Sequence, residues 1–160
     1  MISQNFVLKT KCYLALEVVK RQNYKLHFLK PSSYISEFIY VNKTNGMDRG
    51  VFTKAALKKR TLIEIAPVIV MSNKDRVHLD KTLLHDYIFE WGENKDECCM
   101  ALGYVPLYNH SYKSNCEYEM NFAQRTISII TVRSIEQGEE LFINYNGDWN
   151  SNKKLWFNAK

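Results

Sequence analysis

Three consecutive polar residues, Asn109-His110-Ser111, are candidates for chemistry because they follow directly on an apolar run, Ala101–Tyr108. An amide, an imidazole and a hydroxyl are costly to bury unless each finds a hydrogen-bond partner. We therefore expect a ligand or another polar group to meet them. Taken alone, His110 is also compatible with a hydrogen-bonded histidine of the core.

A second unusual segment, Gly138–Tyr145, combines an acidic turn with a short strand that ends on a tyrosine. Glu139 and Glu140 follow the turn glycine directly, and the apolar residues Leu141–Ile143 precede the end of the strand. A tyrosine in such a place most often packs at the core or at its rim. A function can therefore be assigned to Tyr145 only when this segment is considered together with Asn109-His110-Ser111.

The usual metal, nucleophile and phosphate motifs do not occur in the sequence. The 4 histidines are scattered and form no H-x-x-x-H pair, and the 4 cysteines form no C-x-x-C pair. There is no P-loop and no G-x-G-x-x-G. We expect no metal site and no disulfide framework, and we interpret the cysteines as buried structural thiols.

The net charge of +5 hides a difference between the two parts of the chain. Residues 1–60 hold 12 Lys and Arg against 3 acids, whereas residues 61–160 hold 10 against 14. The basic part can attract nucleic acid or an acidic surface, and the acidic part can attract a basic peptide. Each charge cluster can also simply solvate the surface.

Length and composition indicate one ordered globular domain. The chain has 160 residues, of which 46% are hydrophobic, with only 6 Gly and 3 Pro. No run approaches the roughly 18 apolar residues of a spanning helix, which predicts no membrane insertion. The first residues lack the features of a secretory signal, so we expect an intracellular chain, in the cytoplasm or the nucleus, with reduced thiols.

The elements that position these segments follow from hydrophobic periodicity. Helical spacing over 8–19 and over 80–92 predicts two helices, the second with Asp80 as its N-cap. Alternating or β-branched residues predict a buried strand over Leu62–Met71, broken at Pro67. Further strands are predicted over 24–28, 37–52 (two strands flanking a loop), 126–132 and 141–145. The pattern favours a β-rich α+β domain.

The two polar segments together, in this order, resemble the signature motifs of SET-domain protein-lysine methyltransferases. Arg49–Phe52 and Leu62–Glu64 are similar to the glycine loop and first strand of that family. The segments 87–91 and 101–104 are most similar to those of short stand-alone SET proteins of viruses and bacteria. The resemblance implies several small β-sheets and a pseudo-knot that brings the two motifs side by side.

The resemblance also implies the reaction and the residues that carry it. The cofactor is S-adenosylmethionine, and the substrate is a lysine of a protein, a histone tail or another basic protein. Tyr145 matches the catalytic tyrosine of the family, and Ile143 occupies a position where an absent hydroxyl leaves room for more than one methyl group. The lysine channel is expected from Tyr87, Tyr104, Tyr118 and Ile143, and the cofactor site from Met47, Asp48, Arg49, Asn109, His110, Tyr145 and Trp156. Trp156 can equally be an ordinary packing aromatic.

The resemblance divides the chain into a basic N-terminal extension (1–34), a SET domain (35–147) and an aromatic C-terminal cap (148–160). The opening loop, Gly46–Gly50, lacks a glycine that the family often has, and Ser114 stands where the family usually has proline. A non-catalytic SET-like binding module with a degenerate cofactor loop is therefore the alternative. A small nucleic-acid-binding protein that uses residues 1–60 is a second one. The short relatives further suggest a homodimer.

Overall fold

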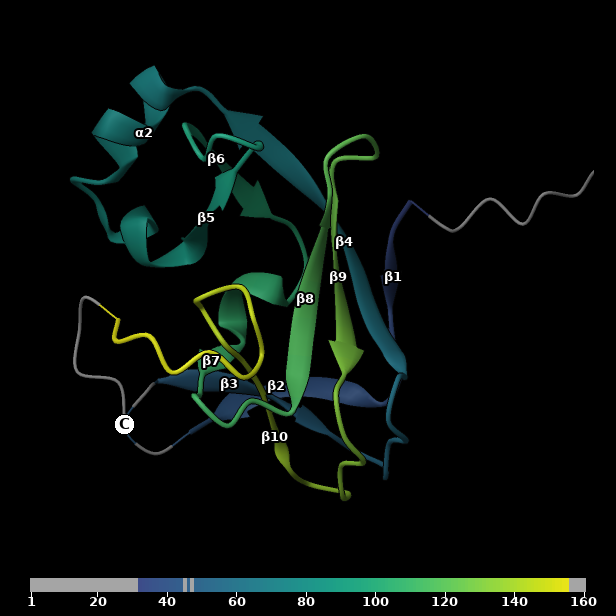
Figure 1. Ribbon diagram of the computed structural model, residues 1–160. Helices are drawn as coiled ribbons and strands as arrows, with labels where there is room; N and C mark the ends of the chain where they lie inside the picture. Colours follow the sequence, from purple (N-terminus) through teal and green to yellow (C-terminus); the bar gives the residue numbers. More distant parts are fainter. Residues whose placement is uncertain (1–31, 45, 47, 156–160) are drawn as a thin grey trace, which may run out of the picture. The chain divides into compact units, whose positions relative to one another are not determined.

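The computed structural model describes residues 32–44, 46 and 48–155, which belong to one compact unit that begins at Ser32. The helix predicted over 8–19 and the strand predicted over 24–28 lie outside the described residues. Ten strands, one α-helix and two 3-10 helices are described, and the strands form two sheets (Figure 1). Among the described residues no helix is long and apolar enough to cross a membrane.

The larger sheet has the strand order β5-β6-β4-β9-β8, and a short strand, β1, also pairs with β4. In Figure 1, β4, β8 and β9 run upright through the molecule. The bounds of these strands are β1 Tyr34–Ile35, β4 Leu62–Met71, β5 Ile88–Trp91, β6 Glu97–Ala101, β8 Cys116–Asn121 and β9 Thr126–Thr131.

The smaller sheet has the order β2-β3-β10-β7 and carries both polar segments. Its strands are β2 Ile39–Lys43, β3 Arg49–Thr53, β7 Asn109–His110 and β10 Glu140–Ile143. The two strands predicted over 37–52 are confirmed as the antiparallel pair β2 and β3. β7 and β10 pair in parallel, with Phe142 opposite Asn109 and Ile143 opposite His110. The predicted side-by-side placement of the two motifs is thereby confirmed.

Pro67 does not break β4, contrary to our expectation. Leu62–Pro67 pairs with β9, and the following residues, Val68–Met71, pair with β6. Because proline has no N–H to donate, it fits at the point where the strand exchanges one partner for the other. The proline therefore marks a change of neighbour inside a continuous ten-residue strand.

The helix predicted over 80–92 is also wrong. The α-helix of this region, α2 (Asn73–Leu79), lies earlier, and a capping box between Ser72 and Asp75 begins it. Asp80 is its C-cap, and a 3-10 helix, η1 (Leu83–Tyr87), follows. Of the apolar residues that suggested a helix, Leu83, Leu84 and Tyr87 lie in η1. Ile88 and Trp91 lie in β5, where Trp91 is buried and pairs with Glu97 of β6. We call residues 73–101, which comprise α2, η1, β5 and β6, the insert segment.

The core consists of the apolar sides of both sheets. Ile63, Ile127 and Ile129 contribute from the larger sheet, and Val51 and Leu141 from the smaller one, all with no exposed surface. Each such side chain stabilises the fold by about 1.5–3 kcal/mol relative to an exposed one. Cys98, Cys99 and Cys116 are buried free thiols, as expected. The core thus joins the two sheets that carry the two polar segments.

Candidate active site

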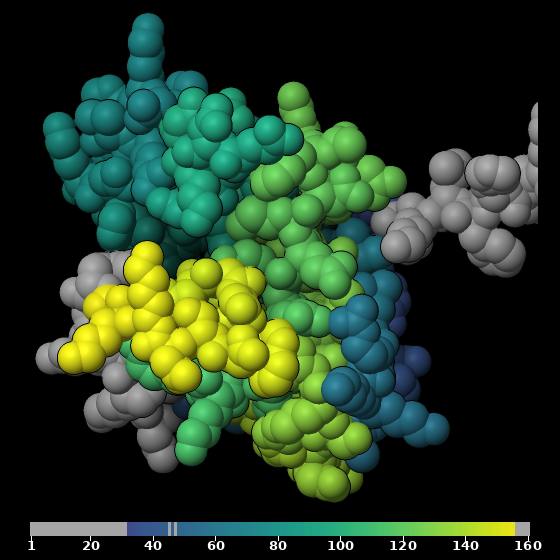
Figure 2. All heavy atoms as spheres, in the orientation of Figure 1, coloured from purple at the N-terminus to yellow at the C-terminus, as the bar shows by residue number. Residues whose placement is uncertain are grey.

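A cavity of about 1420 Å³ is lined by residues of the insert segment, of Val105–Asn109, of β8 and of the C-terminal part of the chain, together with Asp48 and Arg49. In Figure 2 the yellow C-terminal residues lie next to the teal insert segment, and the surface is hollowed between them. A second 3-10 helix, η2 (Val105–Leu107), lies on its wall and leads into β7. Side chains predicted for the site that line this cavity are Tyr87, Tyr118, Tyr145, Asn109, Asp48 and Arg49.

Tyr145 follows β10 and is held at both its backbone and its hydroxyl. Its hydroxyl donates to the carbonyl oxygen of Tyr108 at 2.9 Å, and its backbone N–H donates to Nδ1 of His110 at 3.2 Å. Burial, and then the nearby Tyr87 and Asp86, raise the pKa of Tyr145 to about 12. At neutral pH the phenol is therefore protonated, so it acts as an oriented hydrogen-bond donor and not as a base.

His110 lies behind Tyr145 and does not line the cavity. Only 7% of its surface is exposed, and its ring lies 5.2 Å from that of Tyr145 and 4.6 Å from that of Tyr112. A backbone N–H can only donate, so Nδ1 must be an acceptor and the proton of the neutral ring is on Nε2. Burial also lowers the pKa of His110 and so favours this neutral form. His110 thus orients the backbone of Tyr145.

Two of the four predicted channel residues line the same cavity as Tyr145. Tyr87 ends η1, and Tyr118 of β8 packs edge-on against Phe89 with 5.6 Å between ring centroids. Burial raises the pKa of Tyr118 to about 12, so this phenol is also protonated at neutral pH. Tyr104 and Ile143 do not line the cavity: Tyr104 caps η2, and Ile143 is fully buried in the core.

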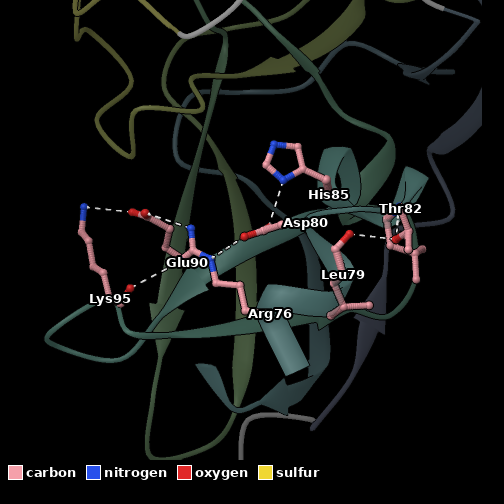
Figure 3. Close-up of polar contacts among 8 residues, drawn as sticks. Arg76, Leu79, Asp80, Thr82, His85, Glu90 and Lys95 are labelled. Atoms are coloured by element: carbon pink, nitrogen blue, oxygen red, sulfur yellow. Dashed lines mark hydrogen bonds and ion pairs between the residues drawn. The ribbon is translucent and has the colours of Figure 1, made fainter. Parts of the chain in front are cut away.

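A network of charged residues holds η1 against α2 and so positions Tyr87 (Figure 3). Arg76 of α2 approaches Asp80 at 3.8 Å and Glu90 at 3.5 Å, and it donates to the carbonyl of Lys95 at 3.3 Å. Asp80 also lies 3.0 Å from Nδ1 of His85, within η1. These exposed pairs contribute little energy singly, but together they connect the turns that surround η1.

Asn109 connects the second motif to the opening loop. Its amide nitrogen donates to the carbonyl of Arg49 at 2.9 Å and to Oε1 of Glu140 at 2.7 Å. The hydroxyl of Thr44 donates to the other carboxylate oxygen of Glu140 at 3.0 Å. A Cβ at Gly50 would collide with Glu140 and Asn109, so only glycine lets these groups meet. Met47 and Trp156, two further residues predicted for the cofactor, lie outside the described residues.

Two asparagine side chains at the end of the second motif hold the backbone of the C-terminal residues at the cavity. Asn144 donates to the carbonyl of Ser151 at 2.8 Å, and Asn146 donates to that of Lys153 at 2.8 Å. Both of these C-terminal residues line the cavity. Trp149, which we expected in an aromatic cap, is 43% exposed and does not line it.

Two buried or half-buried carboxylates and one amide were missed as site residues. Glu140 is the orienting partner of Asn109, whereas its neighbour Glu139 points outward and pairs with Arg133 at 2.8 Å. Asn115 bridges β10 by donating to the carbonyl of Glu140 and accepting from the N–H of Phe142, each at 2.8 Å. Glu64, the third, is fully buried. Its one signal in the sequence is a charged residue inside the apolar run of Leu62–Met71.

The geometry provides two features of a group-transfer site. Tyr87, Tyr118 and Tyr145 all line the cavity. Asn109, which also lines it, connects Arg49 to Glu140 beside Gly50. The described residues contain no group of three or more His, Cys, Asp or Glu side chains arranged to hold a metal ion.

Comparisons with known proteins agree with this arrangement. A family model described as the SET domain matches residues 48–146. A Schizosaccharomyces pombe relative, a histone-lysine N-methyltransferase specific for lysine 37 of H3, is 34% identical over 118 residues. The alignment covers 73% of this chain and 75% of that relative.

Solved structures show the same fold. A candidate histone methyltransferase of Plasmodium falciparum has a TM-score of 0.55 at 29% identity, covering 72% of this chain and 98% of that one. A humanized mutant of the Chaetomium thermophilum Polycomb Repressive Complex 2, bound to an inhibitor, has a TM-score of 0.58 at 16% identity. That match covers 67% of this chain and 14% of the other. The family match, the relative and the shared fold agree with the motifs, and the chain belongs to the SET-domain family of protein-lysine methyltransferases.

Proposed function

We propose that this chain transfers the methyl group of S-adenosylmethionine to the side-chain amine of a lysine in a histone or another basic protein. The observation that carries the proposal is the hydroxyl of Tyr145, which the carbonyl of Tyr108 holds at 2.9 Å beside a cavity that Tyr87 and Tyr118 also line. The chain is thus an enzyme, a protein-lysine N-methyltransferase.

The residues at the opening loop fit the methyl donor. Gly50 allows close approach of the backbone, and the exposed carboxylate of Asp48 is suited to an ammonium group. We assign Met47, Asp48, Arg49, Asn109, Tyr145 and Trp156 to the cofactor site, with His110 acting behind Tyr145. Bound there, S-adenosylmethionine supplies an electrophilic methyl group on a sulfonium.

The phenols orient the lysine, and they do not deprotonate it. A free lysine has a pKa near 10.4, and only its neutral form has a lone pair for the methyl group. Tyr145 and Tyr118 are protonated at neutral pH, so their hydroxyls and the carbonyl of Tyr108 align the amine within the cavity. Tyr145 is the proposed catalytic residue, and Tyr87 and Tyr118, which line the cavity, are the proposed channel residues.

The substrate segment is proposed to be basic. Asp86 lines the cavity beside Tyr145 and forms no ion pair with any residue that the structure describes. By contrast, Glu90 pairs with Arg76 and Lys95, each at 3.5 Å, and Glu117 pairs with Arg60 at 2.6 Å. Asp86 is therefore the acid best placed to attract a lysine- or arginine-rich peptide. Because the Schizosaccharomyces pombe relative acts on histone H3, H3 is the first substrate to test.

A product with more than one methyl group is part of the proposal. It rests on the sequence argument that Ile143 has no hydroxyl, although Ile143 lies in the core and not on the cavity wall. Mass spectrometry of a peptide incubated to completion is expected to detect dimethyl or trimethyl lysine. A product that remains monomethylated at long times would contradict this part of the proposal.

Four finer predictions rest on the sequence alone and belong to the same proposal. The chain acts inside the cell, in the cytoplasm or the nucleus, and is most similar to the short viral and bacterial SET proteins. It forms a homodimer, which light scattering on the purified chain tests. Residues 1–60 make a secondary contact with nucleic acid, which a steep fall of DNA affinity with salt would support.

The deciding experiment begins with binding of S-adenosylmethionine by calorimetry to the wild type, Asn109→Ala and Asn42→Ala. Asn42 lies in β2 outside the cavity and is the matched control. We expect binding to the wild type and the control but not to Asn109→Ala. Absence of binding to all three would favour the non-catalytic binding module.

A methylation assay on histone H3 then compares Tyr145→Phe with Tyr40→Phe. Tyr40 packs on Phe52 in the smaller sheet and does not line the cavity. Loss of the Tyr145 hydroxyl is expected to lower kcat about a hundredfold, because the amine is no longer aligned. Equal activity of the two variants would overturn the role of Tyr145.

A further inference from the structure

Glu64 is a buried carboxylate that the methyl-transfer chemistry does not itself use. It lies in β4, has no exposed surface and stands opposite Ile35 of β1 and Ile129 of β9. Cross-strand neighbours lie on the same face of a sheet, so two isoleucines border the carboxylate. A carboxylate in such surroundings requires a specific set of hydrogen bonds.

The hydrogen bonds of Glu64 reach both ends of one short turn. Oε1 accepts from the backbone N–H of Tyr104 at 2.7 Å, and Oε2 accepts from the hydroxyl of Tyr108 at 3.2 Å. Between these two tyrosines the chain forms η2. A Cβ at Gly103 would collide with Oε1, so the glycine before the turn is what lets the carboxylate approach the backbone. Glu64 therefore closes the turn as a clamp.

The turn that Glu64 clamps supplies the hydrogen-bond acceptor of Tyr145, the proposed catalytic residue. The side chain of Tyr108 is bound to Glu64, and its carbonyl accepts the hydrogen bond of the Tyr145 hydroxyl at 2.9 Å. Asn109 and His110 follow Tyr108 in the chain. A movement of the turn would displace the acceptor that orients the Tyr145 hydroxyl.

We propose that Glu64 is a positioning residue for methyl transfer, which in its ionised form clamps the turn of residues 104–108 and thereby places the hydroxyl of Tyr145. This inference rests on the proposed function and adds a role for a residue outside the cavity.

The titration of Glu64 makes the clamp testable. Burial raises the pKa of Glu64 to about 7, while the Tyr104 N–H, the Tyr108 hydroxyl and the Val105 N–H act in the opposite direction. The other titratable groups of the surroundings are Tyr104 and Tyr108 themselves and Cys116, which acts on Tyr108. Ionised Glu64 accepts both bonds of the clamp, whereas its protonated form has one oxygen that must donate.

The first arm of the test measures kcat between pH 6 and pH 8 for the wild type and E64Q, at saturating donor and peptide. The substrate lysine titrates in the same way in both assays. The ratio of kcat for the wild type to kcat for E64Q therefore reports only the effect of the titration of Glu64. For a single group that titrates near 7, we expect the ratio to rise about tenfold over this range. A ratio that is constant across the range would overturn the proposal.

Y108F and I127V are the companion variants. Y108F keeps the ring in the core but removes a hydrogen bond that lowers the pKa of Glu64, so its activity is expected to rise at a higher pH than that of the wild type. Ile127 is a buried β9 residue away from the turn, and I127V reproduces a loss of stability alone. The ratio of kcat for I127V to kcat for the wild type should not change with pH. Should E64Q fail to fold, Y108F against I127V decides the question.

The second arm does not depend on activity. In protein with isotope-labelled tyrosine, the ring resonance of Tyr145, assigned with Y145F, is expected to shift with a midpoint near 7 in the wild type, although its own pKa is about 12. E64Q should lose this shift. An inactive wild type that still shows the shift would refute the proposed function alone, and an active wild type without it would refute the role of Glu64.

Discussion

Tyr145 faces the cavity while His110, its neighbour in the fold, lies behind it. Both were predicted as site residues from adjacent motifs, but the direction of a side chain depends on the strand that carries it. Nδ1 of His110 accepts a hydrogen bond from the N–H of Tyr145, which agrees with the alternative of a hydrogen-bonded core histidine. The same reason separates Glu140, which points to Asn109, from Glu139, which pairs with Arg133.

Asp86 is the residue whose charge we expect to govern substrate affinity. Asp86→Asn should raise KM for a basic peptide about fivefold at low salt with little change in kcat, and the effect should shrink as salt increases. Steady-state kinetics at several ionic strengths measure this. The matched control is Asp96→Asn, an exposed residue that does not line the cavity. A similar KM change in both variants would show that only the overall charge matters.

At the scale of elements, the parallel pair β7 and β10 is the structure that brings the two motifs together. The two strands lie far apart in the sequence, and the side chain of Asn115 helps to hold β10 in place. It donates to the carbonyl of Glu140 and accepts from the N–H of Phe142. The insert segment is held differently, by the ion pairs around Arg76 that connect α2 to the turns near η1. Tyr87 therefore rests on a more exposed support than Tyr145 does.

Asn115→Ala should destabilise the fold by about 2–4 kcal/mol, because it leaves two backbone groups of β10 without their partner. Urea denaturation measures the change, and binding of S-adenosylmethionine should weaken along with it. Asn121→Ala, at the exposed end of β8 where the hairpin turn begins, removes hydrogen bonds that water can replace. If the two variants are equally stable, Asn115 does not hold β10.

For the whole molecule, the contributions of Glu64 to stability and to activity are expected to change with pH in opposite directions. The folded state raises the pKa of Glu64 from 4.5 to about 7, so it favours the protonated form. The contribution of this group to stability is full below pH 4.5 and is lost as pH rises to about 7. The proposed clamp, by contrast, needs the ionised form.

We therefore predict that the stability difference between the wild type and Glu64→Gln changes by about 2–3 kcal/mol between pH 5 and pH 8. The wild type should lose stability relative to the variant as pH rises. Urea denaturation at both pH values measures the difference, and groups that titrate alike in both proteins cancel. A difference that does not change with pH would mean that Glu64 titrates in the folded state as it does in the unfolded one.

The sequence by itself was sufficient for the family, the β-rich α+β class and the pairing of the two motifs. Its local patterns carry this information: the β-branched run of 126–132 became β9, and the two segments around Asn109 and Tyr145 keep the order of the family. The helical spacing over 80–92 led to the wrong prediction of a helix, because a helix and the strand β5 can both place Trp91 in the core.

Only the tertiary structure decided which polar groups meet. Glu64 binds Tyr104 and Tyr108, 40 and 44 residues away, and Glu140 binds Thr44, 96 residues away. No local pattern specifies such pairs, because burial and hydrogen-bond partners are set by how the two sheets pack. For the same reason Ile143 and Tyr104, predicted beside Tyr145, lie outside the cavity wall. Glu64, a carboxylate within an apolar run, instead binds Tyr108, whose carbonyl accepts from the hydroxyl of Tyr145.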